Sequence, residues 1–173
     1  TTEQDRQGFV DDVMGLLSLA LLVLTVLAWL CAPWLIRIYA PGFYLDTSAQ
    51  RFDLAVEMLR WTFPYIACIS LTSCVAAILN SHGKFVMGAW MPVLLNVCLI
   101  FGAGLSVAFF AADVLILART VMVAGLLQCA VMYGYAYRSG FRFHWRCRWR
   151  HPWIQRLGHL MVLGILGAIV GQL

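Results

Sequence analysis

The sequence predicts an all-α integral membrane protein, a polytopic helix-bundle fragment with four complete transmembrane helices and a truncated fifth. Of its 173 residues, 62% are hydrophobic and 12% are charged, and the mean hydropathy is +0.84. Soluble domains contain about 25% charged residues, so this composition excludes an ordinary soluble fold. Apolar runs long enough to cross a hydrocarbon core of about 30 Å recur along the chain. No low-complexity linker or soluble domain separates them, so we expect residues 1–173 to be a fragment of one transmembrane domain.

Five apolar runs define the expected spans. They cover residues 13–36, 61–79, 85–110, 114–137 and 157–173. The first four are long enough to cross a bilayer as helices, whereas the last is still apolar at Leu173, without a flanking charge or aromatic anchor. The polar start TTEQDRQGFVDD lacks the basic segment and the short apolar segment of a signal peptide. We therefore expect both ends to continue in a longer protein.

Local signals predict where the helices meet their loops. The pair Pro41-Gly42 is typical of a turn and should end the first helix. An interfacial helix is expected to follow and to run into the second span, and its candidate N-caps are Asp46, Thr47 and Ser48. The next loop, NSHGK at 80–84, is a tight connection in which Gly83 suits a left-handed turn.

The distribution of basic residues predicts the orientation in the membrane. If the four complete runs all span, eight of the 12 lysines and arginines lie on one side and four on the other. The larger group is Arg6, Lys84, Arg138, Arg142, Arg146, Arg148, Arg150 and Arg156, and the smaller is Arg37, Arg51, Arg60 and Arg119. Because cytoplasmic loops carry an excess of basic residues, the Thr1 side is expected to be cytoplasmic.

Prolines and amides inside the runs predict helix kinks and polar contacts between helices. Pro64 and Pro92 each remove one hydrogen bond within a helix and favour a kink. Asn96 and Gln128 lie near the centres of their runs, where an unpaired amide is costly. We expect each to make a hydrogen bond between helices, worth about 0.6 to 2 kcal/mol. The alternative for both amides is direct contact with a transported substrate.

Arg119 is a charged residue inside a predicted span. It is the sixth residue of its run, which places it about 8 Å from the start of the helix. A long arginine side chain can reach the interface over that distance. We therefore predict an interfacial anchor, with Asp113 as a candidate partner, and the alternative is a role in transport.

The segment FRFHWRCRWRHPW at 141–153 is the densest cluster of rings and cations in the chain. Its alternation of aromatic and basic residues would also suit single-stranded nucleic acid. Because the segment lies between two predicted spans, we expect its rings at headgroup depth and its arginines on anionic phospholipids, and we predict no nucleic acid partner. The predicted cytoplasmic lipid anchor consists of Arg142, Trp145, Arg146, Arg148, Trp149, Arg150 and Trp153.

The sequence contains no motif for catalysis, cofactor binding or metal binding. His144, Cys147 and His151 fall short of the four ligands of a structural zinc site, and the surrounding arginines repel a cation. His82 and His159 are isolated, and the six cysteines lie singly, mostly in apolar runs, as expected of buried small hydrophobic residues. No nucleophile is paired with a base and no phosphate-binding loop is present. We predict a protein that is not an enzyme.

The stretch LRWTFPYIACISLTSCVAAILNSHGKFVMGAWMPVLLNVCLI resembles the lipid II flippase family MurJ, also called MviN. The resemblance rests on FPYI, then S-L, then A-x-I-L-N, a small and basic turn with K-F, and P-x-L-L-N. CAPWLIRIYAPGF at 31–43 and AGLLQ at 124–128 resemble the motifs that flank this stretch in the family. The match covers nearly the whole chain in order. Arg119 departs from the family, which usually has an uncharged residue there.

The resemblance implies fourteen helices in two lobes that alternate access to a central cavity, as in the multidrug, oligosaccharidyl-lipid and polysaccharide exporter superfamily. This chain would supply the third to sixth helices and the start of the seventh. The implied activity of the full-length protein is translocation of lipid II, the undecaprenyl-pyrophosphate-linked peptidoglycan precursor, across the bacterial inner membrane. The family's cavity residues are carried mainly by the first, second and eighth helices, so the substrate-binding residues are expected outside this chain.

The resemblance implies no cofactor, and coupling to an ion gradient or to the membrane potential stays open. Two other functions also stay open at this point. One is a related exporter of drugs, polysaccharide or another lipid-linked oligosaccharide. The other is a non-transporting membrane scaffold subunit, for which packed helices and a lipid-binding loop would be enough.

Overall fold

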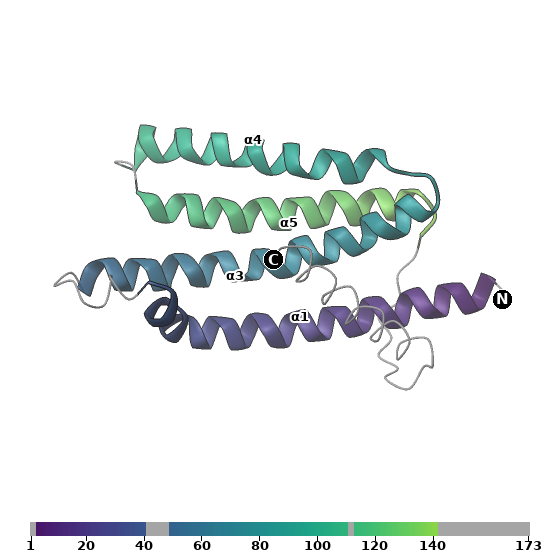
Figure 1. The fold of residues 1–173 in the computed structure, drawn as a ribbon. Coiled ribbons are helices and arrows are strands. Elements are labelled where there is room, and N and C mark those ends of the chain that lie inside the picture. Colours follow the sequence, from purple (N-terminus) through teal and green to yellow (C-terminus); the bar gives the residue numbers. More distant parts are fainter. Residues whose placement is uncertain (1–2, 41–48, 111–112, 142–173) are drawn as a thin grey trace, which may run out of the picture. The chain divides into compact units, whose positions relative to one another are not determined.

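The computed structural model describes residues 3–40, 49–110 and 113–141, and these ranges contain four α-helices and no strand. The helices are α1 (Glu3–Tyr39), α3 (Ala49–Ser81), α4 (Val86–Phe109) and α5 (Val114–Arg138), as Figure 1 shows. Each is long and apolar enough to cross a membrane, which confirms the predicted all-α polytopic class. The fifth predicted run, 157–173, lies outside the described residues.

Two of the helices are much longer than the apolar runs that they contain. α1 has 37 residues and α3 has 33, so they are about 55 and 50 Å long, against about 30 Å for a hydrocarbon core. The predicted runs 13–36 and 61–79 lie inside them. The interfacial helix expected before the second span and that span itself form one uninterrupted helix, α3. Helical hydrogen bonds continue past the hydrocarbon boundary because nothing in the chemistry of the backbone ends a helix there.

Three helix ends have a local cause in the sequence: the start of α5, the end of α3 and the end of α5. Asp113 caps α5 by accepting a 2.9 Å hydrogen bond from the Leu115 N–H. Between α3 and α4, Gly83 has φ +77°, the left-handed conformation predicted for the NSHGK turn. After α5, Gly140 has φ +91° and ends the helix in the same way. The candidate caps of α3, Asp46, Thr47 and Ser48, lie outside the described residues.

Residues 20–142 form one compact unit, which contains α3, α4, α5 and α1 from Ala20 onward. Successive helices run in opposite directions, so α3 and α5 are parallel and α4 is antiparallel to both (Figure 1). α5 packs against both α3 and α4, whereas α3 and α4 contact each other only sparsely. Among these three helices, α5 therefore takes the central position.

The buried stripe of α5 explains why it takes this central position. Its buried residues recur at helical spacing and four of them are small: Ala118, Ala124, Gly125, Gln128, Met132 and Ala136. Small side chains let helix backbones approach closely, which drives association in lipid, where burial of apolar surface supplies little. Large apolar side chains face outward instead, among them Ile100, Phe101, Val107 and Phe109, each about 70% or more exposed. Such a surface suits lipid or further helices rather than water.

Candidate functional site

A buried amide joins α4 and α5. Gln128 is 1% exposed and donates a 2.7 Å hydrogen bond from Nε2 to the carbonyl oxygen of Met91. The other amide atom, Oε1, is buried and accepts no hydrogen bond within the described residues. Gln128 thus makes an interhelical hydrogen bond, and its acceptor is a backbone carbonyl oxygen rather than a side chain.

Two glycines mark close approaches between helices. A Cβ atom on Gly125 of α5 would lie 2.7 Å from Cδ2 of Tyr65 and 3.2 Å from Cβ of Cys68, both on α3. A Cβ atom on Gly102 of α4 would lie 2.6 Å from Cγ2 of Thr120 on α5. Real Cβ contacts are essentially never shorter than 3.0 Å, so a larger residue at either position would require the facing side chains or the helices themselves to shift.

A second polar contact between α3 and α5 involves sulfur. The Cys129 thiol donates to the carbonyl oxygen of Cys68 at 3.2 Å, and its Sγ atom lies 3.3 Å from Oγ1 of Thr72. Thr72 in turn donates to the same Cys68 carbonyl at 2.8 Å. Cys68 and Cys129 are both free thiols, and they pack as small residues that make weak polar contacts.

The other residues predicted to shape the helices lie in different surroundings. Pro64 is half-buried in α3 and cannot donate to the Arg60 carbonyl oxygen, and Pro92 is exposed in α4 and cannot donate to Gly88. Asn96 is exposed and makes no side-chain hydrogen bond within the described residues. It lies about 140° around α4 from Met91, away from α5. The interhelical role of Asn96 therefore stays a prediction that requires a partner beyond the described bundle.

At one end of the unit, the α3–α4 turn contacts the end of α5. The Lys84 ammonium donates to the carbonyl oxygen of Ser139 at 3.4 Å and lies 5.5 Å from the ring centroid of Phe141. The ring of His82 meets the same phenylalanine edge-on, with centroids 4.7 Å apart. These contacts hold together two loops that are far apart in the sequence.

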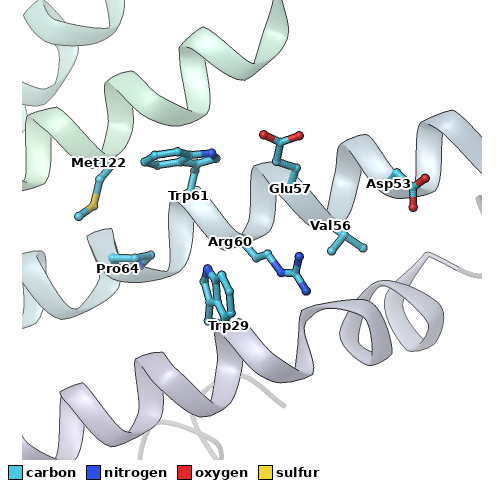
Figure 2. A pocket seen from close by; sticks show the side chains of 8 residues that line it. All are labelled: Trp29, Asp53, Val56, Glu57, Arg60, Trp61, Pro64 and Met122. Carbon is cyan, nitrogen blue, oxygen red and sulfur yellow. The ribbon is translucent and has the colours of Figure 1, made fainter.

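The opposite end holds a cavity of about 660 Å³, shown in Figure 2. Its lining comes from α1, α3 and α5 and consists of Trp29, Asp53, Val56, Glu57, Arg60, Trp61, Pro64 and Met122. The Arg60 guanidinium extends from α3 toward α1 and lies 4.8 Å from the ring centroid of Trp29. Its Nε atom is buried and has no hydrogen-bond partner among the described residues. The cavity therefore combines cationic, anionic and aromatic groups.

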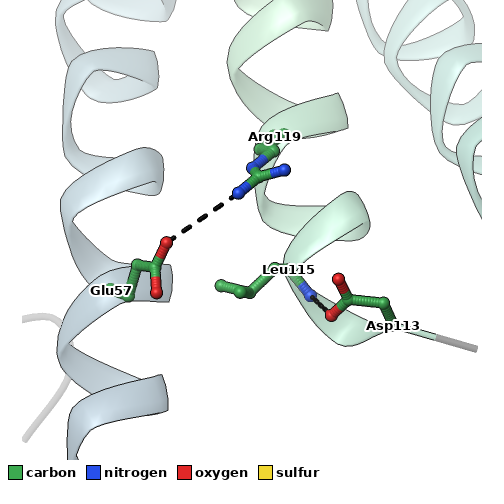
Figure 3. A network of polar contacts seen from close by, with 4 residues as sticks. All are labelled: Glu57, Asp113, Leu115 and Arg119. Carbon is green, nitrogen blue, oxygen red and sulfur yellow. Dashed lines mark hydrogen bonds and ion pairs between the residues drawn. The ribbon is translucent and has the colours of Figure 1, made fainter. Parts of the chain in front are cut away.

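Next to this cavity, Arg119 of α5 pairs with Glu57 of α3 (Figure 3). Arg119 Nη2 lies 3.9 Å from Glu57 Oε1, both side chains are about half exposed, and the guanidinium lies 5.5 Å from the ring centroid of Trp61. Asp113, the partner that proximity along the chain suggested, instead caps its own helix. That expectation was wrong because the Asp113 carboxylate accepts from the Leu115 N–H at the start of α5, whereas the neighbouring helix α3 brings Glu57 within reach of Arg119.

Sequence reasoning missed this charged end, although a signal was present. Six lining residues belong to α3, and their spacing places them along one side of that helix: Asp53, Val56, Glu57, Arg60, Trp61 and Pro64. The sequence prediction for this part of the chain is an interfacial helix, without a charged site along it. Trp29 has no local signal, because it comes from another helix.

The predicted lipid anchor lies outside the described residues, as do the metal candidates His144, Cys147 and His151. The anchor residues are Arg142, Trp145, Arg146, Arg148, Trp149, Arg150 and Trp153. In the part of the chain that the structure describes, no group of three or more histidine, cysteine or acidic side chains is placed to hold a metal ion. The anchor stays a prediction from sequence.

Four membrane-length helices, joined by small residues and a buried amide and with ion pairing near one end, define a multi-pass helical membrane protein. The sequence matches the family model described as "Lipid II flippase MurJ" over residues 1–173, and the chain belongs to this family.

Several relatives share this family name. A "Probable lipid II flippase MurJ" of Buchnera aphidicola subsp. Acyrthosiphon pisum is 32% identical over 171 residues, covering 99% of this chain and 33% of the relative. The protein of the same name from Rhizobium tropici is 36% identical, covering 94% of this chain and 30% of the relative. A "Lipid II flippase MurJ" of Burkholderia cenocepacia is 39% identical over 125 residues, covering 72% of this chain and 24% of the relative. The chain thus spans about a third or less of the length of these curated relatives.

Proposed function

We propose that the full-length protein containing this chain translocates lipid II across the bacterial inner membrane. The observation that carries the proposal is the family match over all 173 residues, supported by relatives whose names state lipid II flippase activity. The protein then acts as a transporter rather than an enzyme, since moving a lipid between leaflets needs no covalent step.

The proposed mechanism is alternating access. The anionic pyrophosphate of lipid II binds cationic groups in a central cavity outside this chain, while its lipid tail stays in or near the bilayer. The helices described here supply part of the framework of one lobe. The close packing of α5 against α3 and α4 supports this role, because elements joined at Gly125 and Gly102 can move together as one body.

The proposed orientation places the end with Lys84 and Arg138 in the cytoplasm. Arg37, Arg60 and Arg119 belong to the opposite end, where α1 finishes and α3 and α5 begin. The excess of basic residues on the first side supports this orientation. Single cysteines at Ser81 and Asp53 test it in intact cells, in a background without native cysteines. A membrane-impermeant thiol reagent should label the cysteine at 53 only, and labelling at 81 alone would reverse the orientation.

Depletion of the full-length protein tests the proposed activity. Lipid II should accumulate in the cytoplasmic leaflet while its synthesis continues, and expression of the intact gene from a plasmid should restore its normal distribution. An unchanged leaflet distribution after depletion would contradict the proposal. The segment 1–173 expressed by itself should not restore transport, because the proposed cavity residues lie outside it.

A further inference from the structure

We propose that the cavity at the N-terminal end of α3 binds the headgroup of a zwitterionic phospholipid, with the phosphate on Arg60 and the ammonium group beside Asp53 and Glu57. This site goes beyond the proposed transport function, because its ligand is a lipid of the surrounding bilayer and not the transported precursor. The family description assigns no role to the residues of this site.

Arg60 supplies the anion-binding group. Its guanidinium makes no hydrogen bond or ion pair within the described residues, and its Nε atom is fully buried. A buried donor without an acceptor is costly, and a guanidinium presents a planar fork that matches two oxygens of a phosphate. Stacking on Trp29 holds the guanidinium in place without using any of its N–H groups. A phosphate in the cavity would satisfy these donors.

Two carboxylates in the same lining decide which phosphate is favoured. Asp53 and Glu57 line the cavity but form no ion pair with Arg60, and Glu57 is only loosely paired with Arg119 at 3.9 Å. Their negative charges oppose a strongly anionic group such as a pyrophosphate and attract an ammonium group. The lining thus complements a headgroup that carries both charges.

The position of the cavity along the helices agrees with such a ligand. α3 is about 20 Å longer than a hydrocarbon core, and the predicted span begins only at Trp61. The segment from Asp53 to Arg60 therefore lies at headgroup depth. Deeper in the cavity, Pro64 and Met122 provide apolar contacts for the start of the acyl chains.

Native mass spectrometry of the protein in detergent tests this site. The full-length protein that contains residues 1–173 would be titrated with phosphatidylethanolamine and, separately, with phosphatidylglycerol of the same acyl chains. We expect tighter binding of phosphatidylethanolamine. Arg60→Gln should weaken that binding about tenfold or more, since it removes charge-assisted hydrogen bonds.

Arg51→Gln is the matched control, because Arg51 lies on the same helix and does not line the cavity. It should leave the affinity within about twofold of the starting value. The double variant Asp53→Asn with Glu57→Gln keeps Arg60 on Trp29 and should shift the preference toward phosphatidylglycerol, so it tests the site even if Arg60→Gln fails to fold. Equal affinity for the two lipids in the unmodified protein, or unchanged binding in folded Arg60→Gln, would overturn the proposal. Leaflet transport of lipid II is a separate measurement and does not bear on this result.

Discussion

The Gln128 side chain of α5 bonds to the Met91 carbonyl of α4 at 2.7 Å, directly before Pro92. A carbonyl oxygen has two lone pairs, so Met91 can accept this bond without giving up a helical one. The donor is buried, and the sparse contact between α3 and α4 leaves α5 as the helix that holds α4 in place. This single bond therefore contributes to the position of α4 in the unit.

Replacing Gln128 should loosen α4. We expect Gln128→Ala to lower the free energy of unfolding in detergent by about 2 kcal/mol, through the lost hydrogen bond and the cavity left behind. Gln128→Leu should cost less, about 1 kcal/mol or below, because it refills the volume and removes the unpartnered Oε1. Denaturant titration followed by circular dichroism measures both. Asn96→Leu, at an exposed position of α4, is the control, and equal losses for the alanine and leucine variants would contradict this account.

Gly125 should not tolerate a side chain. Gly125→Ala places a methyl group within 2.7 Å of the Tyr65 ring, so we expect a loss of about 1 to 3 kcal/mol and a wider spacing of α3 and α5. Gly134→Ala on the same helix is the matched control, because nothing lies within 4 Å of its Cβ position. It should be neutral or stabilising by up to about 1 kcal/mol, given the higher helix propensity of alanine. Thermal unfolding in one detergent compares the two, and similar midpoints would show that α3 and α5 are not in close contact there.

The Glu57–Arg119 pair should contribute little to stability. Both side chains are about half exposed and the closest atoms are 3.9 Å apart, so we expect a coupling energy below about 1 kcal/mol. A double-mutant cycle with Glu57→Gln and Arg119→Gln measures it, and the coupling should fall further as salt is added. A coupling of several kcal/mol would instead indicate a pair shielded from water by lipid or by further helices.

The arginines of the predicted cytoplasmic lipid anchor should control membrane insertion. Changing Arg146, Arg148 and Arg150 together to glutamate reverses three charges that favour a cytoplasmic location, each worth about 1 kcal/mol on an anionic surface. We expect the abundance of correctly inserted protein to fall, measured by membrane fractionation and impermeant thiol labelling. The triple lysine variant keeps the charge and should insert normally. Normal abundance of the glutamate variant with selective loss of transport would instead indicate a role in substrate handling.

At the end of the unit that holds the cavity, the α3 lining residues could have been predicted from the sequence, whereas the partner of Arg119 could not. The lining residues of α3 from Asp53 to Pro64 follow helical spacing, so one strip of charge and aromatic surface was visible along a single helix. The partner of Arg119 was not visible, because Asp113 and Glu57 are both carboxylates at plausible depth. Only the packing of α5 on α3 distinguishes them. The same holds for Asn96 and Gln128, two central amides with equivalent surroundings in sequence.

The amino-acid sequence alone specifies a multi-pass helical membrane protein, because apolar runs of membrane length leave the backbone no alternative to helices. Its motifs also predicted the family that the comparisons established, and the φ angle of Gly83 followed from the need for a tight turn. The tertiary structure decided which groups meet: Gln128 with the Met91 carbonyl, Arg119 with Glu57, and Arg60 with Trp29. These contacts join residues 31 to 62 positions apart, and they depend on which face each helix turns toward its neighbour. That choice is made by close packing of small residues such as Gly125, and packing between helices has no local signature in the chain.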